Sequence, residues 1–210
     1  AGSNLKDLTK RADTVVFDAE GQELGIINAG HFVYDKIEDI SPNLQNAYIA
    51  QEDRNFKTHH GVDYKATLRA VFSLIKNKGR ITQGGSTITQ QVVKNTYLTQ
   101  EKTFTRKIVE IMLAQELEKM YSKADIMEIY CNTNFYGNNC YGVEAASQYY
   151  FEKSAKDLTV EEAAMLAGIS NAPSRYEPVR HPDLALKKRN QVLKSMETVG
   201  YLTEAEYEEA

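Results

Sequence analysis

The sequence contains two cysteines, no long apolar run and no excess of basic residues. Cys131 and Cys140 have no zinc-type spacing, so we expect two free thiols, and a disulfide only if their loop brings them together. No apolar run approaches the roughly 18 residues that would indicate a membrane span. The net charge of −4, from 25 basic and 29 acidic residues, gives no global basic field and argues against nucleic acid as a partner.

There is also no signal peptide, internal repeat or low-complexity segment. The 210 residues, 42% of them apolar and 26% charged, suffice for one well-buried domain of one or two lobes. The opening Ala1-Gly2-Ser3 resembles a cloning remnant, so we expect a targeting or anchoring segment to have been removed.

Local patterns predict a mainly α protein with a small N-terminal β appendage. Apolar runs at 15–17 and 24–27 flank a turn and are typical of two short strands. After residue 41 the apolar positions follow helical spacing. Helix starts are marked by Ser41 with Pro42, Thr87 with Gln90, Ser122 with Asp125, and Thr159 with Glu162. The segment 103–121 is apolar over a wide arc, so we expect that helix to be central to the fold.

Two adjacent carboxylates, Glu52 and Asp53, end the helical run that begins at Ser41. Glu52 lies one turn past Tyr48, at the edge of an apolar face, where a carboxylate can serve as a general base. The alternative is a solvated Glu-Asp pair at a helix end. His59 and His60 follow; they could ligate a metal, but no third ligand has a fixed spacing, which favours a structural role.

Glu110 is the second carboxylate of interest. Arg106 and Lys107 precede it by one helical turn, and Leu113, Ala114 and Leu117 follow on the same side, so Glu110 is predicted on a buried helix between cations and apolar residues. The alternative is a surface ion pair worth under about 1 kcal/mol.

A glycine pair before a helix N-terminus suggests an anion site. Gly84 and Gly85 precede the helix that carries Lys94, and Lys102 and Arg106 follow soon after. Free backbone N–H groups and the helix dipole favour a phosphate or carboxylate there, and a diphosphate would need several such cations. The Gly-Lys-Ser/Thr of a P-loop is missing, so a nucleotide is not indicated.

Five ordered motifs over roughly residues 40–200 resemble the family 51 peptidoglycan glycosyltransferases, which occur in class A penicillin-binding proteins and monofunctional transglycosylases. The matching stretches are Glu52-Asp53-x-x-Phe56-x-x-His59-x-Gly61, Gly85-Ser86-Thr87-Ile88-Thr89-Gln90-Gln91, Arg106-Lys107-x-x-Glu110, Lys123-x-x-Ile126-Met127-Glu128-x-Tyr130-x-Asn132, and Ala163-x-x-Leu166-Ala167 within 158–173. Cys131 stands where the family usually has Leu, and the loop 133–141 carries extra Asn and a second Cys, so its detail departs from the pattern.

The resemblance implies a lysozyme-like, bilobal helical domain with a head and a membrane-facing jaw. It also implies that lipid II is polymerised into glycan strands, with inversion at the donor carbon. The donor is the growing chain on a polyprenyl diphosphate, and the acceptor is lipid II. By motif position Glu52 is the general base and Glu110 the second catalytic glutamate. Substrate contacts are expected from Asp53, His59, Arg69, Ser86, Gln91, Lys94, Lys102, Arg106, Lys107 and Asn132.

The expected organisation is a linker with short strands over 1–39, the glycosyltransferase domain over 40–200, and a segment over 201–210 that leads toward an absent transpeptidase domain. No tightly bound cofactor is expected; Mg or Mn could assist the diphosphate. The location would be the extracytoplasmic face of a bacterial membrane, with this piece soluble once cut from its transmembrane anchor. Two alternatives remain open: a glycoside hydrolase or lytic enzyme on the same fold, and a non-catalytic cell-wall binding module.

The helix expected over 63–78 is the candidate for the membrane-facing jaw. Its apolar lane is followed by basic residues, a pattern that suits an interfacial helix on anionic lipid. The lane comprises Tyr64, Leu68, Val71, Phe72 and Ile75, with Leu74 just off it. If the jaw hypothesis is right, Phe72 or Leu74 is solvent-exposed; the alternative is that the whole lane is core.

Overall fold

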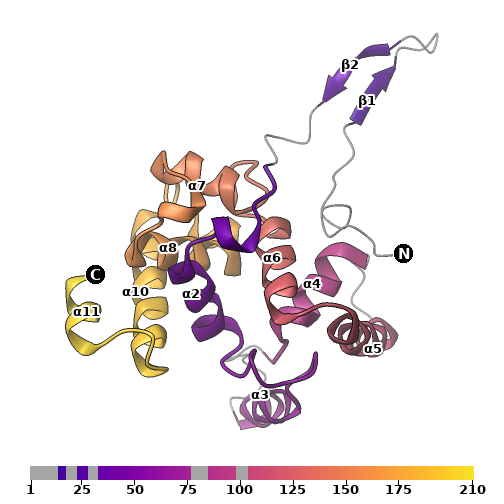
Figure 1. Cartoon of the computed structure of the whole chain (residues 1–210), viewed down its shortest axis with the longest axis vertical. Coiled ribbons are helices and arrows are strands. Elements are labelled where there is room, and N and C mark those ends of the chain that lie inside the picture. The colour runs from indigo at the N-terminus through magenta and orange to yellow at the C-terminus, as the bar shows by residue number, and fades with distance from the viewer. Residues whose placement is uncertain (1–13, 18–22, 28–32, 77–84, 98–103) are drawn as a thin grey trace.

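The computed structural model describes residues 14–17, 23–27, 33–76, 85–97 and 104–210. The first elements that the structure describes are an antiparallel pair, β1 (Thr14–Phe17) and β2 (Glu23–Ile27), in which Val15 pairs with Ile26. This confirms the predicted β appendage. Figure 1 shows the pair projecting away from a body built of helices.

The helical body comprises η1 (Ile37–Asp39), α2 (Pro42–Glu52), α3 (Tyr64–Lys76), α4 (Ile88–Tyr97), α5 (Phe104–Met120), α6 (Lys123–Thr133), α7 (Val143–Phe151), η2 (Ala155–Asp157), α8 (Val160–Asn171), α9 (Pro173–Tyr176), α10 (Pro182–Thr198) and α11 (Glu204–Glu209). The predicted start signals are confirmed. Ser41 caps α2, and reciprocal capping boxes open α6 at Ser122 and α8 at Thr159.

The core lies where α2, α8 and α10 pack together and continues into α4 and α6. Tyr48 of α2 is fully buried, and its ring meets Tyr130 of α6 edge to face with centroids 4.9 Å apart. The hydroxyls of Tyr48 and Tyr136 share a hydrogen bond. Because both ends of the Tyr48 side chain are held, the direction of α2 is fixed relative to α6.

The expectation that α5 is central to the fold is wrong. Among its apolar side chains, Met112 is 60% and Met120 67% exposed, and Ile108, Val109 and Leu113 are also exposed. Glu110, Ala114 and Leu117 form the buried face, and α5 packs against α4. Helical periodicity indicates apolar surroundings for a face but does not tell a protein core from another apolar environment. Figure 1 shows α3 and α5 along the lower edge of the body, with α10 and α11 at its left.

Candidate active site

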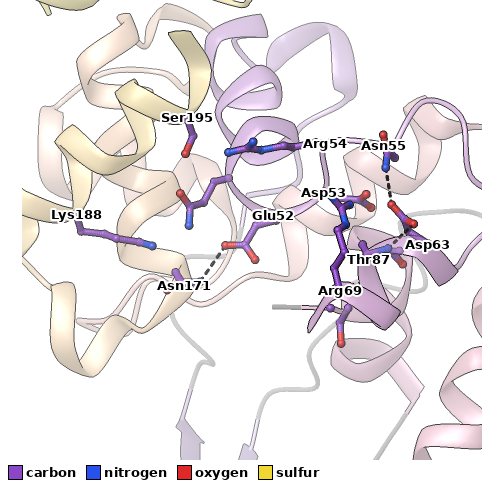
Figure 2. Close-up of a pocket in the computed structure, with 14 residues that line it drawn as sticks. Glu52, Asp53, Arg54, Asn55, Asp63, Arg69, Thr87, Asn171, Lys188 and Ser195 are labelled. Atoms are coloured by element: carbon purple, nitrogen blue, oxygen red, sulfur yellow. Dashed lines mark hydrogen bonds between the residues drawn. The ribbon is translucent and has the colours of Figure 1, made fainter. Parts of the chain in front are cut away.

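A pocket of about 550 Å³ opens at the C-terminal end of α2. Residues of the α2 end, of α3 and of the approach to α4 line one side, and residues of α8 and α10 line the other (Figure 2). Four of the residues predicted from the sequence are in this lining: Glu52, Asp53, Arg69 and Ser86. The remaining lining residues are Gln51, Arg54, Asn55, Asp63, Ala66, Gly85, Thr87, Asn171, Lys188 and Ser195.

Glu52 is the last residue of α2, and two amide side chains hold its carboxylate. Asn171 Nδ2 donates to Oε1 at 3.0 Å, and Gln91 Nε2 donates to Oε2 at 3.2 Å. Gln91 is itself oriented because Tyr130 Oη donates to its Oε1 at 3.1 Å. The carboxylate is half-buried and reaches the pocket, so it keeps acceptor capacity for a substrate proton. The fixed partners make Gln91 a residue that positions Glu52.

The side chain of Asp53 points away from that of Glu52 and is almost fully buried (Figure 2). Its Oδ2 accepts the amide N–H of Ile88 at 3.0 Å and lies 2.7 Å from His59 Nε2. Nδ1 of His59 accepts the N–H of Gly61 at 3.1 Å, which assigns the ring proton to Nε2. Both ring nitrogens are therefore engaged within the protein, and the structural hypothesis for His59 fits this geometry.

The Asp53 contact corrects the expectation of free N–H groups at the start of α4. The Ile88 amide binds Asp53, and the Thr87 amide donates to its own capping partner, Gln90 Oε1, at 2.9 Å. An internal carboxylate thus satisfies the helix end that was expected to bind an anion. Gly84 and Lys102, the other parts of that hypothesis, lie outside the described residues.

Glu110 belongs to a second cluster of polar side chains. It is 3% exposed, forms an ion pair with Lys107, and accepts from Gln90 Nε2 at 3.2 Å. Lys107 Nζ also donates to Ser86 Oγ at 2.9 Å. The predicted residues Ser86, Lys107 and Glu110 are therefore brought together, and Ser86 links them to the pocket. Lys94 is exposed in the last turn of α4, and Arg106 is partly exposed on α5.

Asn132, expected to contact substrate, lies elsewhere. It is 1% exposed, its Nδ2 donates to the carbonyls of Asp35 and Glu128 at 2.8 Å, and its Oδ1 accepts the Asp35 N–H at 2.9 Å. Every polar atom of its side chain is used to attach the N-terminal segment to α6. This geometry supports a structural role, and substrate contact by Asn132 stays an untested prediction.

Residues of α8 and α10 were not predicted, although the sequence carries a signal for one of them. Lys188 interrupts the buried lane of α10 formed by Ala185, Val192 and Met196, and is itself 7% exposed. A lysine at a core position of an amphipathic helix is uncommon unless it has a partner or a function. Asn171, which binds Glu52, lies within the matched stretch 158–173 but was not singled out there, and Ser195 has no comparable signal.

The residues of this region do not fit a divalent cation by themselves. Among the described residues no group of three or more His, Cys, Asp or Glu side chains is arranged for a metal. The buried carboxylates already have partners, since Asp53 binds His59 and Ile88, and Glu110 binds Lys107 and Gln90. We therefore derive no chemical step through a metal.

Comparison with known proteins gives concordant results. The family model described as "Transglycosylase" matches residues 20–197. Penicillin-binding protein 1A of Aquifex aeolicus is 46% identical over 98% of this chain, and penicillin-binding protein 1F of Bacillus subtilis is 42% identical over 96%. The chain spans 28% of the length of each of these relatives.

The fold also has a solved counterpart. The crystal structure of penicillin-binding protein 1A from Haemophilus influenzae covers 94% of this chain with a TM-score of 0.50 and 22% identity, and the match covers 20% of that chain. This likeness confirms the expected lysozyme-like helical fold. The matched family model and the relatives together show that the chain belongs to the transglycosylase family, as its resemblance to the family 51 peptidoglycan glycosyltransferases predicted.

Proposed function

We propose that this domain polymerises lipid II into glycan strands by inverting transfer from a polyprenyl-diphosphate-linked donor chain. The observation that carries the proposal is the placement of Glu52. Its carboxylate opens into the pocket and is held by Asn171 and Gln91, and within the described part of the chain no cationic side chain contacts it directly. A carboxylate oriented in this way can accept a proton from a sugar hydroxyl, which is a poor nucleophile without a base.

In the proposed reaction, the acceptor hydroxyl gives its proton to Glu52 as its oxygen attacks the anomeric carbon of the donor. The bond from that carbon to the diphosphate oxygen breaks on the opposite face, so the configuration inverts. Negative charge develops on the leaving diphosphate and must be met by fixed donors and cations. Ser86 and Lys107 lie together and Arg69 lines the pocket, so these groups are available for this role; Lys94 and Arg106 are proposed to add to it from the sequence pattern.

Glu110 supports the diphosphate end indirectly. Its buried carboxylate binds Lys107, whose ammonium also reaches Ser86. Holding both groups at once restricts the lysine, because a point charge on a flexible stem is otherwise mobile. We therefore assign Glu110 to placing the cation, and Glu52 to the proton transfer.

We further propose that α3 and α5 face a membrane. Tyr64, Leu68 and Phe72 are each more than half exposed on α3, and Met112 and Ile108 are exposed on α5. Exposed apolar faces of this kind mark an interaction surface, and a lipid-linked substrate must be taken from a bilayer. None of the described helices is long and apolar enough to cross a membrane. The domain would then act at the extracytoplasmic face of a bacterial membrane.

The test is single-turnover assay of the parent protein and Glu52→Gln with lipid II. The parent should form glycan polymer, and the variant should be slower by roughly 10²–10⁴-fold while keeping its thermal unfolding transition. A parallel assay on finished peptidoglycan separates polymerisation from hydrolysis, the chemistry of the alternative enzyme class. Cleavage of finished strands without polymer formation would overturn the proposal, as would binding of lipid II without turnover.

A further inference from the structure

We propose that Lys188 is an additional catalytic residue, whose ammonium donates a hydrogen bond to the attacking hydroxyl of the acceptor while Glu52 takes that hydroxyl's proton. This inference rests on the function proposed above and assigns the side of the pocket formed by α8 and α10 to the acceptor sugar. Figure 2 shows the Lys188 side chain reaching from α10 toward the space occupied by the Glu52 carboxylate.

The first observation is that Lys188 is buried and has no polar partner among the residues that the structure describes. The residue is 7% exposed, yet no hydrogen bond or ion pair joins its ammonium to any described residue. The ammonium lies over the ring of Tyr176, whose centroid is 5.6 Å from Nζ. A buried ammonium has three donors, and leaving them unmade costs free energy. Because Lys188 lines the pocket, a ligand oxygen in the pocket can supply the missing acceptor.

The second observation is that the backbone directs this side chain. Ala185, Val192 and Met196 place this face of α10 against the core. A Cβ built on Gly168 of α8 would lie 3.0 Å from Lys188 Cγ, so the stem of the lysine runs close over the glycine. The absence of a side chain at Gly168 lets the stem pass, and the charged end then emerges beside the pocket.

The third observation concerns the space between the two charges. The Glu52 oxygens bind Asn171 and Gln91, and Lys188 Nζ is not within ion-pair distance of either oxygen. An oxygen placed between them can accept from the ammonium and donate to the carboxylate, and its second lone pair is then left for attack on the donor carbon. In the transfer, the O–H bond breaks to Glu52, the new C–O bond forms, and the donor diphosphate leaves.

The charged surroundings agree with this role. Burial lowers the pKa of the Lys188 amine below its usual range, and the negative charge of Glu52 partly offsets that effect. The other charged residues in the pocket lining are Asp53, Arg54, Asp63 and Arg69, and the ring of Tyr176 from α9 lies beside the ammonium. The ammonium should therefore lose its proton at a pH nearer neutrality than an exposed lysine does, and activity should fall with it.

The experiment compares Lys188→Met, Lys188→Arg and the matched control Lys187→Met, which changes the exposed neighbour on α10. Single-turnover transfer to lipid II is measured from a preformed donor chain while acceptor concentration and pH are varied. Lys188→Met should reduce kcat/KM for the acceptor on the order of 10²-fold and abolish the alkaline limb of the pH profile. Lys188→Arg should retain more activity than Lys188→Met and move the alkaline limb upward, because arginine stays protonated. Lys187→Met should match the parent.

Parental activity and an unchanged alkaline limb in Lys188→Met would overturn the assignment of Lys188. The proposed function would still stand in that case if Glu52→Gln abolished polymerisation by the parent protein. If Lys188→Met does not fold, the pH profile of Lys188→Arg is the deciding measurement. An alkaline limb at the same pH as in the parent would contradict a role for the lysine proton. A parent protein that makes no polymer from lipid II would overturn both proposals.

Discussion

The imidazole of His59 and the carboxylate of Asp53 lie 2.7 Å apart, measured from Nε2 to Oδ2, and both groups are buried. The same carboxylate oxygen accepts the Ile88 amide, so the pair joins the end of α2 to the start of α4. Lys123 reinforces the far side, donating to the His59 carbonyl at 2.8 Å. The residue that precedes Asp53 is Glu52, and the pair therefore anchors the backbone next to the proposed base.

Replacing His59 should destabilise the fold because Asp53 would keep a buried charge with one fewer donor. We expect His59→Ala to lower the free energy of unfolding by about 1–3 kcal/mol in urea titrations. His60→Ala is the matched control, since that side chain is exposed. Equal midpoints for the two variants would contradict the role given to the Asp53–His59 contact.

Removing cations from the diphosphate side should weaken donor binding more than stability. We expect the double variant Lys94→Ala with Arg106→Ala to bind diphosphate-sugar inhibitors of the moenomycin type less tightly, because a desolvated diphosphate needs fixed positive charge. Binding is measured by fluorescence anisotropy, with Lys119→Ala as the control, an exposed lysine paired with Glu116. Parental affinity in the double variant would show that the diphosphate binds elsewhere.

The exposed face of α3 should contribute to lipid binding and little to stability. Leu68 and Phe72 are 58% and 64% exposed, which meets the condition set by the jaw hypothesis; the side chain of Leu74 is outside the described set. Changing both Leu68 and Phe72 to Ser should reduce sedimentation with anionic liposomes while the melting temperature changes little, because truncating core residues would instead cost about 2–5 kcal/mol each. Leu184→Ser with Leu186→Ser, on α10, is the control. Unchanged liposome binding together with a large drop in melting temperature would refute the membrane role.

The free energy of unfolding should decrease as the pH rises because of Asp35, a residue that does not line the pocket. Burial, reinforced by the neighbouring Glu144 carboxylate, raises the pKa of Asp35 to about 7. An unfolded aspartate titrates near about 4, so the folded chain holds the extra proton between these values. The contribution is present below about pH 4 and is lost as the pH rises through about 7.

The variant Asp35→Asn should remove this loss because the amide stays neutral. The difference in melting temperature, variant minus parent, should increase between about pH 5 and about pH 8. Asp183→Asn is the control, because that residue is exposed at the start of α10 and is not among the groups that raise the pKa of Asp35. A constant difference between parent and Asp35→Asn across this range would rule out titration of Asp35 as the cause.

The sequence predicted those features whose determinants are close together in the chain. The capping boxes at Ser122 and Thr159 depend on residues three positions apart, and the motif around Glu52 lies at the end of a helix whose start Ser41 and Pro42 define. The default of free thiols is also confirmed, since neither Cys131 nor Cys140 forms a disulfide. Signals of this kind can be recognised in the sequence without knowing how the helices pack.

What could not be predicted depends on contacts between distant residues. Asp53 reaches Ile88 across 35 positions, so nothing local to the glycine pair showed that the start of α4 was already satisfied. Asn171 reaches Glu52 across 119 positions. The exposed face of α5 has the same periodicity as a core helix, so its position at the edge of the body could not be read from spacing. Lys188 was detectable as a break in an apolar lane, but its approach to the pocket depends on Gly168 of another helix.

The reactivity of the two buried thiols can report how often the regions around them open to solvent. Cys131 is fully enclosed on α6, Cys140 is 5% exposed in the loop that precedes α7, and burial raises the pKa of both. A thiol reagent needs the thiolate and a path to it, so labelling in native buffer can proceed only when each region opens. Because one cysteine lies within a helix of the core and the other in a loop, their separate labelling rates would distinguish global unfolding from local release of the loop.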